Sequence, residues 1–589
     1  MTTEATLPMA DSQPNLATNA EVRRLQIGCW IALIAIAAVR AWFTRYEVMG
    51  GDSLAYLDVA RAAAEGHPGI AIHAYWSPGY PVLLSLFLRF FHPGVYWELP
   101  LVHLANLLIF IATLTCFQLF WAETQRWHEK YAEVSGSKIA GSPFWALGYA
   151  AFSIATLNVI RVGTASPDLL VSAFCCLAAW SALCFRRAPS IHRSLLLGLV
   201  LALGYYAKAP FFPMGIIFLL CACSRRYVSR REVLLGAVAP VTFLLLCTPF
   251  IAAISLAKGR LTFGDSSRIS QAVYINGVQF YEHWQGGPPG SGMPVHPTRK
   301  LNDYPEIYEF AAKNMGTYPA WFDPSYWYEG ITPHLNWSRQ AVVFVRDLAL
   351  EFQIIMESGA EVVYVLIVLA LLANCHRLWI DGFRQLWFVW MPGAMALAMF
   401  ALVHVESRFL GGWLILLFAG AVCACSLPAD IGTRRAVQCI GAAALITAGL
   451  SLILQASREA VGIDHAAGRG SHDASIAVSL LNSGLHPGDQ VALIGNGTEA
   501  YWAHLARLQL IAEIPAGISS RPGHPAMDFW ESGSEQQQKA LAILEKTGAK
   551  AVIAGSQQSI TASVPSIVPP PWKKIDGTGA YVYFFPATP

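Results

Sequence analysis

The chain has 589 residues, of which 55% are hydrophobic and only 13% are charged, and its mean hydropathy is +0.43. Soluble domains carry roughly a quarter charged residues, so this composition predicts a membrane protein and excludes an ordinary soluble one. The formal net charge is only +2, and we expect no nucleic-acid partner.

Apolar runs recur along most of the chain. A helix that spans a bilayer needs roughly 20 mostly apolar residues. About eleven runs reach or approach this length, at residues 25–43, 98–121, 143–160, 168–185, 194–208, 209–223, 233–257, 358–375, 386–403, 409–427 and 437–455. They predict an all-α polytopic membrane protein with about 11 transmembrane helices. The polar residues 1–20 before the first run are expected to form a disordered cytoplasmic tail.

The loops between the runs predict the orientation. Lys and Arg residues gather in every second short loop, which places those loops and the N-terminus on the cytoplasmic side. The opposite side then holds the loops 44–97, 161–167, 258–345 and 404–408, and everything after about residue 456. The segment 78–91, "PGYPVLLSLFLRFF", is expected to lie at the outer interface, because counting it as a span would invert all later loops. The first outer loop therefore holds two helices, at residues 52–65 and 78–91.

The C-terminal part differs in character from the rest. Short strand-like runs at residues 490–495, 549–555 and 580–585, with a helical pattern at 535–546, predict a small α/β domain. The predicted organisation is a disordered tail (1–20), a transmembrane domain (21–457) and an extracytoplasmic α/β domain (458–589).

Ionisable residues gather on one side of the predicted membrane. Charged groups at or within spans are costly and mark functional positions. In the predicted topology, the outer side carries Asp52, Glu98, His103, Arg161, Asp168, Lys208, His404, Glu406 and Arg408. The two acids Asp52 and Asp168, with the three cations Arg161, Lys208 and Arg408, predict a site at the outer water–lipid boundary.

Each of these residues also has a simpler interpretation. Asp52 and Asp168 could each cap the N-terminus of a helix, and Lys208 and Arg408 could extend from helix ends to lipid headgroups. Taken together, the cations suit a phosphate carried by a lipid. A nearby carboxylate suits general-base work on a hydroxyl or amine. The combination predicts transfer of a group away from a membrane-embedded phosphate carrier.

Several segments resemble the GT-C superfamily of polyprenyl-phosphate-sugar glycosyltransferases, in particular the protein O-mannosyltransferase and aminoarabinose-transferase branch. They are "GDSLAYLDVARAAAEG" from residue 51, "YWSPGYPVLLSLFLRFF" from 75, "ASPDLLVSAFCCLAAW" from 165, "LLLGLVLALGYYAKAP" from 195 and "ESRFL" from 406. The resemblance is best over residues 25–225. It implies a GT-C fold and an enzyme that transfers a sugar from a polyprenyl-phosphate donor to an extracytoplasmic protein, lipid or glycan, with inversion.

The resemblance also implies roles for single residues. Asp52 corresponds to the catalytic base and Asp168 to a second acid, while Lys208, Arg408 and, less closely, Arg161 would hold the donor phosphate. Possible donor or acceptor contacts are Tyr56, His103, His404 and Glu406. No cofactor is implied. Some GT-C enzymes use a divalent metal, and the resemblance leaves this possible here, but it is not indicated, because Ser53 follows Asp52 where the mannosyltransferases tend to have a second acid. The implied location is a bacterial inner (plasma) membrane, with the active site and the C-terminal domain on the periplasmic side.

Other kinds of membrane protein fit these residues less well or equally leave the substrate open. A polytopic transporter or flippase would more typically place charges near the membrane midplane and show internal repeats. If the protein were a scaffold whose tail binds a partner, Asp52, Lys208 and Arg408 would have no functional role. A polymerase or ligase acting on lipid-linked oligosaccharides is a close enzymatic alternative that the sequence leaves open.

Overall fold

The computed structural model describes residues 16–586, apart from 136–138, 225–228, 280–282, 311–315, 374–375, 426, 428–429, 462, 516–524 and 556–570. Residues 1–15 of the expected disordered tail lie outside the described residues. Helix α1 begins at Leu16, inside that expected tail.

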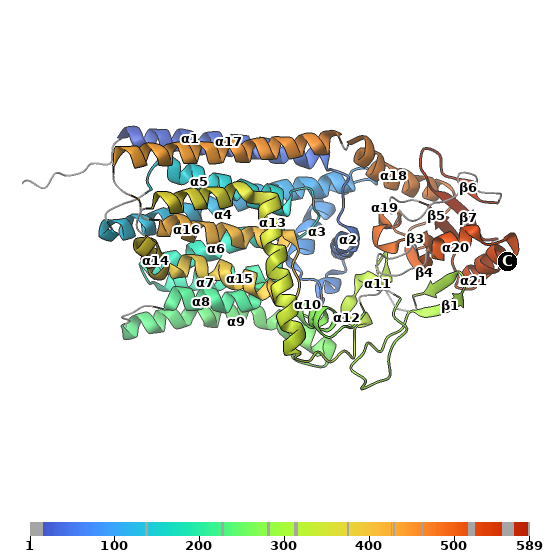
Figure 1. The fold of residues 1–589 in the computed structure, drawn as a ribbon. Helices are drawn as coiled ribbons and strands as arrows, with labels where there is room; N and C mark the ends of the chain where they lie inside the picture. The colour runs from blue at the N-terminus through green and yellow to red at the C-terminus, as the bar shows by residue number, and fades with distance from the viewer. Residues whose placement is uncertain are drawn as a thin grey trace, which may run out of the picture.

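A bundle of apolar helices makes up the larger part of the molecule (Figure 1). Within the described residues, eight helices are long and apolar enough to cross a membrane. They are α1 (Leu16–Phe43), α4 (Glu98–Ser135), α5 with its π-helical end η2 (Ser142–Ser153 and Ile154–Ile160), α6 (Asp168–Arg187), α9 (Arg230–Lys258), α13 (Trp337–Leu372), α16 (Ser407–Ala424) and α17 (Ile431–Val461). The three remaining predicted runs coincide with the shorter helices α7 (Ile191–Ala207), α8 (Phe211–Cys223) and α15 (Trp387–Ala401). A further short helix, α14 (His376–Gln385), precedes α15. The chain is therefore a multi-pass membrane protein.

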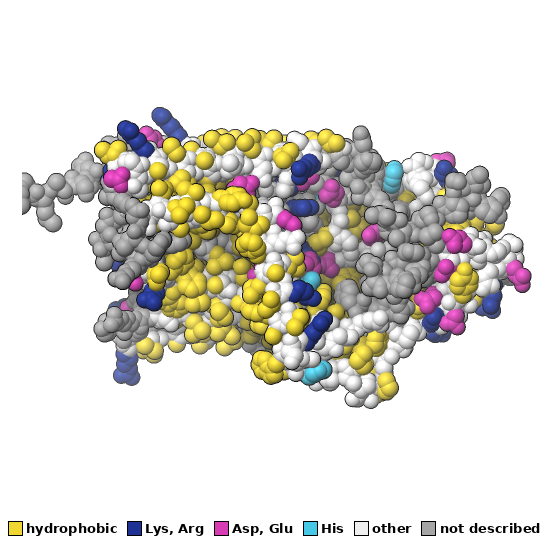
Figure 2. Space-filling view, in the orientation of Figure 1, with side chains coloured by type: hydrophobic (Ala, Val, Ile, Leu, Met, Phe, Trp, Pro, Cys, Tyr) yellow, Lys and Arg dark blue, Asp and Glu magenta, His cyan; other side chains and the backbone are white. Residues whose placement is uncertain are grey.

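The surface of the bundle matches this assignment. Figure 2 shows a nearly continuous apolar surface over the bundle, with Lys and Arg side chains at its left end. Charged side chains of both signs gather where the bundle meets the part on the right. An apolar belt between two polar ends is the surface that a bilayer requires.

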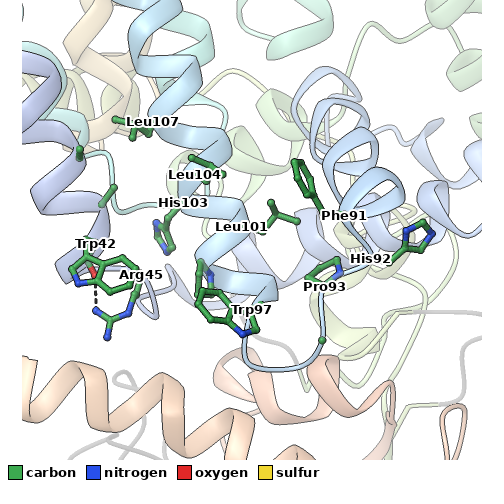
Figure 3. A pocket seen from close by; sticks show the side chains of 14 residues that line it. Trp42, Arg45, Phe91, His92, Pro93, Trp97, Leu101, His103, Leu104 and Leu107 are labelled. Carbon is green, nitrogen blue, oxygen red and sulfur yellow. Dashed lines mark hydrogen bonds between the residues drawn. The ribbon is translucent and has the colours of Figure 1, made fainter.

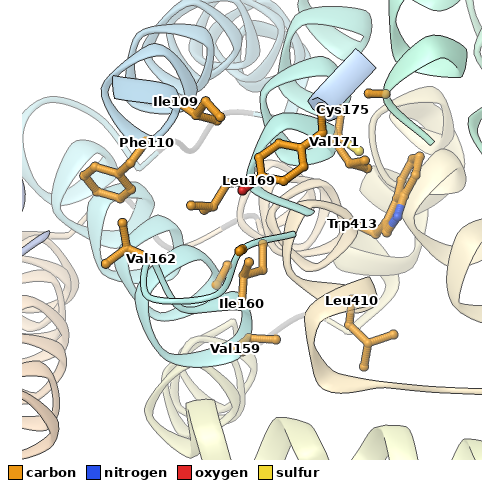
Figure 4. Packing of buried hydrophobic residues seen from close by; sticks show 14 of the residues in the cluster. Ile109, Phe110, Val159, Ile160, Val162, Leu169, Val171, Cys175, Leu410 and Trp413 are labelled. Carbon is orange, nitrogen blue, oxygen red and sulfur yellow. The ribbon is translucent and has the colours of Figure 1, made fainter. Parts of the chain in front are cut away.

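The centre of the bundle is packed through α4, η2, α6 and α16. Figure 4 shows Phe110 of α4, Ile160 of η2 and Leu169 of α6 among the buried side chains that meet there. Helix α16 approaches closely because two of its positions are glycines. A Cβ atom at Gly411 would lie 2.6 Å from the carbonyl oxygen of Ala155, and one at Gly412 would lie 2.8 Å from Ser172 Oγ. Small residues at helix contacts allow such close packing in membranes.

One arginine is buried inside the first predicted span. Arg40 of α1 is 1% exposed, and its Nε donates to Glu459 Oε2 of α17 at 2.9 Å. Its Nη1 also donates to the carbonyl oxygen of Leu157 in η2 at 2.5 Å. This ion pair joins the first helix of the transmembrane bundle, α1, to the last one, α17. The sequence analysis did not identify it.

The first outer loop forms the two expected helices, α2 (Gly50–Ala64) and α3 (Gly79–Phe91), with a short turn η1 (Pro68–Ala71) between them. The large outer loop folds into small elements: α10 (Ser266–Ser270), η3 (Gln271–Ile275), β1 (Arg299–Asp303), β2 (Glu306–Glu309), α11 (Pro319–Phe322) and α12 (Pro324–Trp327). This loop ends earlier than expected, because the Asn336 side chain accepts the Arg339 N–H and caps α13 there. Helix α13 then kinks at Gly359, and its first half runs across the bundle in Figure 1.

The C-terminal part contains a sheet with the strand order β1-β2-β4-β3-β5-β7-β6. The C-terminal part itself supplies the strands β3 (Gln490–Gly495), β4 (Gln509–Pro515), β5 (Ala551–Ala554), β6 (Lys573–Lys574) and β7 (Tyr581–Phe584). It also contains the helices α18 (Ile463–Asn482), α19 (Tyr501–Ala506), α20 (Pro525–Glu531) and α21 (Ser534–Glu545), and a 3₁₀ turn η4 (Gly497–Glu499). Strand β3 lies parallel to β4 and β5, and the other pairs are antiparallel. Strands β1 and β2 come from the large outer loop and join this sheet at β4. The sequence did not predict this pairing, because segments about 200 residues apart leave no local pattern.

A buried ionic cluster joins the C-terminal part to α2 and α4. His504 of α19 lies between two carboxylates, with Nδ1 2.6 Å from Asp58 Oδ1 and Nε2 2.7 Å from Glu98 Oε1. Arg61 donates to Glu98 and to the carbonyl oxygen of His504. Thr317 of the large outer loop donates its N–H to Asp58 at 2.7 Å. The charges of Arg61 and of protonated His504 thus balance those of Asp58 and Glu98. Contacts from the C-terminal part and from the large outer loop together hold helix α2.

His504 makes this contact dependent on pH. Burial alone would favour the neutral ring, and Arg61 adds to that effect, but the carboxylates of Glu98 and Asp58 outweigh both and raise the pKa of His504 above 6.5. A raised pKa in the folded state means that the stabilisation is fully present below about pH 6.5, the pKa of an unperturbed histidine. It is then lost as the pH rises through the pKa of the folded state.

We expect His504→Gln to weaken the docking of the C-terminal part by about 1.5–3 kcal/mol below pH 6.5, because a charged hydrogen-bonding group is lost between two buried carboxylates. Hydrogen exchange of α2 and α19, measured by mass spectrometry across pH 5.5–9, tests this. His486→Gln is the matched control, since the His486 side chain is 78% exposed in the same part of the chain. Equal protection of both variants at every pH would contradict the prediction.

Candidate functional site

Asp52 lies in the first turn of α2 and faces the end of the bundle. It does not cap the helix: Met49 holds the cap position, and its N–H is bonded to Ser53 Oγ at 3.1 Å. The Asp52 carboxylate instead accepts from Trp321 Nε1 at 3.0 Å and from Arg408 Nη2 at 2.6 Å. Its side chain is 23% exposed, so it remains open to a ligand.

Arg408 connects three carboxylates that come from distant parts of the sequence. Besides Asp52, its Nη1 lies 3.4 Å from Asp168 Oδ2 and its Nε 2.6 Å from Glu406 Oε2. Arg408 is the second residue of α16, where the positive end of the helix dipole disfavours a cation. The three carboxylates offset this cost, so the guanidinium is turned toward acids and not toward lipid headgroups.

Lys208 ends α7 and points to the same group. Its Nζ donates to Asp168 Oδ1 at 2.6 Å and lies 3.9 Å from the ring centre of Phe409. Asp168 is 2% exposed and is the first residue of α6, where it makes no capping bond. Asp168 therefore sits behind the two cations and holds both in place.

The charges of this group do not cancel. Three carboxylates face two cations, and His404 Nε2 lies 3.3 Å from Glu406 Oε1. Burial raises the pKa of Glu406, but the hydrogen bond from His404 and the charge of Arg408 outweigh it and lower that pKa to about 2. Glu406 is therefore ionised at neutral pH. Within the described residues, no group of three or more His, Cys, Asp or Glu side chains is arranged to hold a metal ion.

A cavity of about 430 Å³ opens over this group. Its charged wall consists of Asp52, Lys208, His404, Glu406 and Arg408, and its aromatic wall of Tyr56, Tyr75, Trp76, Tyr274 and Trp321. Hydroxyls come from Ser77, Ser266, Ser267 and Ser270. An apolar wall is built by Pro213, Phe263, Val273, Met399, Phe400, Val403 and Phe409. Since α8 and α15 belong to the bundle while α2 and α11 belong to the outer part, the cavity connects an apolar region with a polar one.

The structure separates the predicted site residues into two groups. Asp52, Tyr56, Lys208, His404, Glu406 and Arg408 line the cavity, and Asp168 contacts two of them from behind. His103 is elsewhere: its Nε2 faces the carbonyl oxygen of Glu47 at 3.0 Å, under the α1–α2 connection. Arg161 is exposed, has a backbone φ of 73°, and does not line this cavity.

Trp321 is the main site residue that sequence analysis did not name. Its indole approaches α2 closely, because a Cβ atom at Gly51 would lie 2.6 Å from Trp321 Cδ1. The segment 318–328, "YPAWFDPSYWY", is rich in aromatic residues, and this composition was the available signal. Which of its rings meets Asp52 depends on the path of a long loop.

Comparisons with known proteins give similarity in structure only. No family model and no curated protein matches the chain. Among solved structures, ArnT from Cupriavidus metallidurans in the apo state aligns with 12% identity and a TM-score of 0.47, covering 89% of this chain and 93% of its own. ArnT bound to undecaprenyl phosphate aligns with 11% identity and a TM-score of 0.48, covering 96% and 98%.

A third solved structure is an Archaeoglobus fulgidus oligosaccharyltransferase tethered with an acceptor peptide, at 11% identity and a TM-score of 0.48, covering 90% of this chain and 68% of its own. ArnT is of the kind to which the sequence resemblance pointed. Likeness at this level does not assign an activity.

The ion pairs of Arg408 lead to a prediction on stability. We expect Arg408→Gln to lower the free energy of unfolding by about 3 kcal/mol, because three carboxylates lose the cation that they share and Asp168 keeps only Lys208. Adding Asp52→Asn to this variant should restore part of the loss, because Arg408 is the cation that Asp52 binds, whereas two independent residues would give additive losses. Thermal unfolding of the four proteins of this cycle in detergent measures both effects. A double variant that is less stable than Arg408→Gln would contradict the prediction.

Proposed function

We propose that this protein is an integral membrane glycosyltransferase. It transfers a sugar from a polyprenyl-phosphate-linked donor to a protein, lipid or glycan acceptor on the extracytoplasmic side. The observation that carries the proposal is the cavity in which Asp52 shares Arg408 with Asp168 and Glu406, beside Lys208 and next to an apolar wall.

The cations suit the donor phosphate. Arg408 has five N–H donors, and its three ion pairs leave the second hydrogen of each Nη free. Lys208 uses one of three donors on Asp168. A phosphate can therefore bind both cations while Asp168 still positions them, and its prenyl chain would follow the apolar wall toward the bundle. Charge that develops on the phosphate as it leaves is stabilised by the same two cations.

The aromatic wall suits the sugar. Tyr75, Tyr274 and Trp321 offer ring faces, and the serine hydroxyls offer hydrogen bonds, which is the usual composition of a site for a small polar ligand. Asp52 lies on this side of the cavity, where the acceptor would enter from water.

The reaction follows from this arrangement. Asp52 accepts the proton from the acceptor hydroxyl or amine, whose lone pair forms a bond to the anomeric carbon. The bond between that carbon and the phosphate oxygen breaks, and its electron pair leaves with the polyprenyl phosphate. Attack opposite the leaving group inverts the anomeric centre. A phosphate that competes for Arg408 also loosens its contact with Asp52, which makes the carboxylate available as a base when the donor is bound.

We expect Asp52→Asn to lower kcat by about 10²–10⁴-fold, the usual contribution of a general base, while donor binding is retained. The assay measures release of radiolabelled sugar from a panel of undecaprenyl- and dolichyl-phosphate sugars, with membrane extract as acceptor. Asp303→Asn is the control, since its side chain is 95% exposed on the outer loop. Full activity of Asp52→Asn would remove Asp52 from the reaction. A wild type that turns over no donor but moves labelled lipid across liposomes would favour the transporter.

Trp321 has a separate test. Trp321→Phe keeps a ring but removes the N–H that Asp52 accepts, and we expect kcat to fall about 10–100-fold, as for loss of one hydrogen bond to a charged group. The KM for the donor should change little, because phenylalanine keeps a ring face for the donor sugar. Trp337→Phe, at a side chain that is 75% exposed, is the matched control. A higher KM with an unchanged kcat would assign Trp321 to donor binding instead.

A further inference from the structure

A small polar cavity of about 20 Å³ adjoins the cavity of the candidate functional site. Helix α10 lies between the two. Ser266, Ser267 and Ser270 line the larger cavity, Arg268 lines the small one, and Ile269 lines both. One water molecule needs roughly 10–15 Å³. The small cavity therefore has room for a single occupant of about atomic size.

Three cations line this small cavity. They are Lys258 at the end of α9, Arg260 just after it and Arg268 of α10. Because the cavity is so small, a single occupant lies next to all three residues. Lys258 Nζ donates to the carbonyl oxygen of Ser325 at 3.1 Å, and Arg268 Nη2 donates to that of Ile331. Among the described residues, neither Lys258 nor Arg268 forms an ion pair, and both keep further donors.

The two acids of the lining do not neutralise these three cations. Asp265 accepts from Arg260 Nη2 at 2.6 Å and from the Thr262 hydroxyl at 3.1 Å. Glu329 has its Oε2 2.7 Å from His296 Nε2, and its side chain is 50% exposed. One acid is thus bound to one of the cations, and the other is half in water. The small cavity is left with an excess of positive charge.

The cations of the small cavity also repel one another. Burial lowers the pKa of Arg268 below its usual value, and the nearby charge of Arg260 lowers it further, against the opposing effect of Asp265 and Glu329. An anion between the cations would remove this repulsion and accept hydrogen bonds from their remaining donors.

The larger apolar cavity at the end of α1 lacks such an arrangement. It measures about 550 Å³, and in Figure 3 Trp42 and Arg45 lie on one side of it and Phe91 on the other. Arg45, the one arginine among its described lining residues, donates to the carbonyl oxygen of Trp42 at 2.7 Å. Arg89 lines a separate apolar groove on α3. Several cations around one small space therefore distinguish the cavity beside α10.

We propose that this small cavity binds one chloride ion, held by Lys258, Arg260 and Arg268. Chloride is a single atom, whereas a phosphate or carboxylate group has several atoms and needs a larger space. The ion joins the end of α9 to α10 and to α12, whose Ser325 also lines the cavity. The proposal concerns an ion site in the outer loop and does not depend on the transferase activity.

Thermal unfolding of the full-length protein in detergent tests the proposal, with sodium chloride or sodium gluconate at equal ionic strength. A ligand that binds only the folded state stabilises it. We expect chloride to raise the unfolding temperature in a saturable way, by about 1–3 °C once the site is well occupied.

Arg268→Gln should abolish the response to chloride. Its unfolding temperature in gluconate should stay at or above that of the wild type, because the repulsion between the cations is relieved. A residue with only a structural role would lower the unfolding temperature equally in both salts. Lys258→Gln should behave in the same way as Arg268→Gln. Arg299→Gln, at a side chain that is 66% exposed on the same outer loop, is the control and should keep the full response.

The two salts also act on the whole protein surface. The quantity that decides is therefore the difference in chloride response between the wild type and Arg268→Gln. An equal response of the two proteins would overturn the proposal.

Bromide locates the ion independently of any variant, because it replaces chloride and scatters X-rays anomalously. We expect one anomalous peak among Lys258, Arg260 and Arg268 in crystals of the wild type. The absence of a peak there would overturn the proposal. A peak without any stabilisation by chloride would show an adventitious ion only and would overturn it as well.

Discussion

The guanidinium of Arg408 is the interaction on which the outer end of the bundle depends. It binds Asp52 of the first outer loop, Asp168 of α6 and Glu406 before its own helix. A cation in the first turn of a helix is unfavourable, and a buried carboxylate without a partner is more so. Because neither the cation nor the carboxylates are stable there without the other, the first outer loop, α6 and the start of α16 must come together. The same requirement places two carboxylates, Asp52 and Glu406, and two cations, Lys208 and Arg408, around one cavity, where an incoming phosphate would compete with the carboxylates for the cations.

Helix α2 transmits this arrangement to the rest of the outer part. Asp52 at its start faces the cavity, while Asp58 and Arg61, further along, bind His504 and its neighbours. The large outer loop contributes Trp321 to the start of α2 and Thr317 to its middle, and its strands β1 and β2 extend the C-terminal sheet. The two outer segments therefore form one support for a single carboxylate. A change of protonation at His504 acts on the helix that carries Asp52.

Cations at this end of the molecule fall into two kinds. Lys208, Arg61 and Arg408 are paired with carboxylates and are held in fixed positions. Arg45 and Arg89 lie beside apolar grooves and bond only to carbonyl oxygens among the described residues. The first kind suits a ligand that arrives and leaves, since the acids hold the site together without it.

The sequence by itself determined the helices of the bundle, the two helices of the first outer loop and several strands of the tail, because apolar periodicity is a local property. It also indicated that Asp52, Asp168, Lys208 and Arg408 share one end of the bundle, because topology depends only on the lengths of the runs and on the charged loops. The tertiary structure decided which side chains touch. It joined Asp52 to Arg408 and Trp321, set Arg161 and His103 apart from the cavity, and paired β2 with β4. These contacts link residues 200 to 360 positions apart, and such contacts are selected by burial and charge pairing across the whole fold, not by any local pattern.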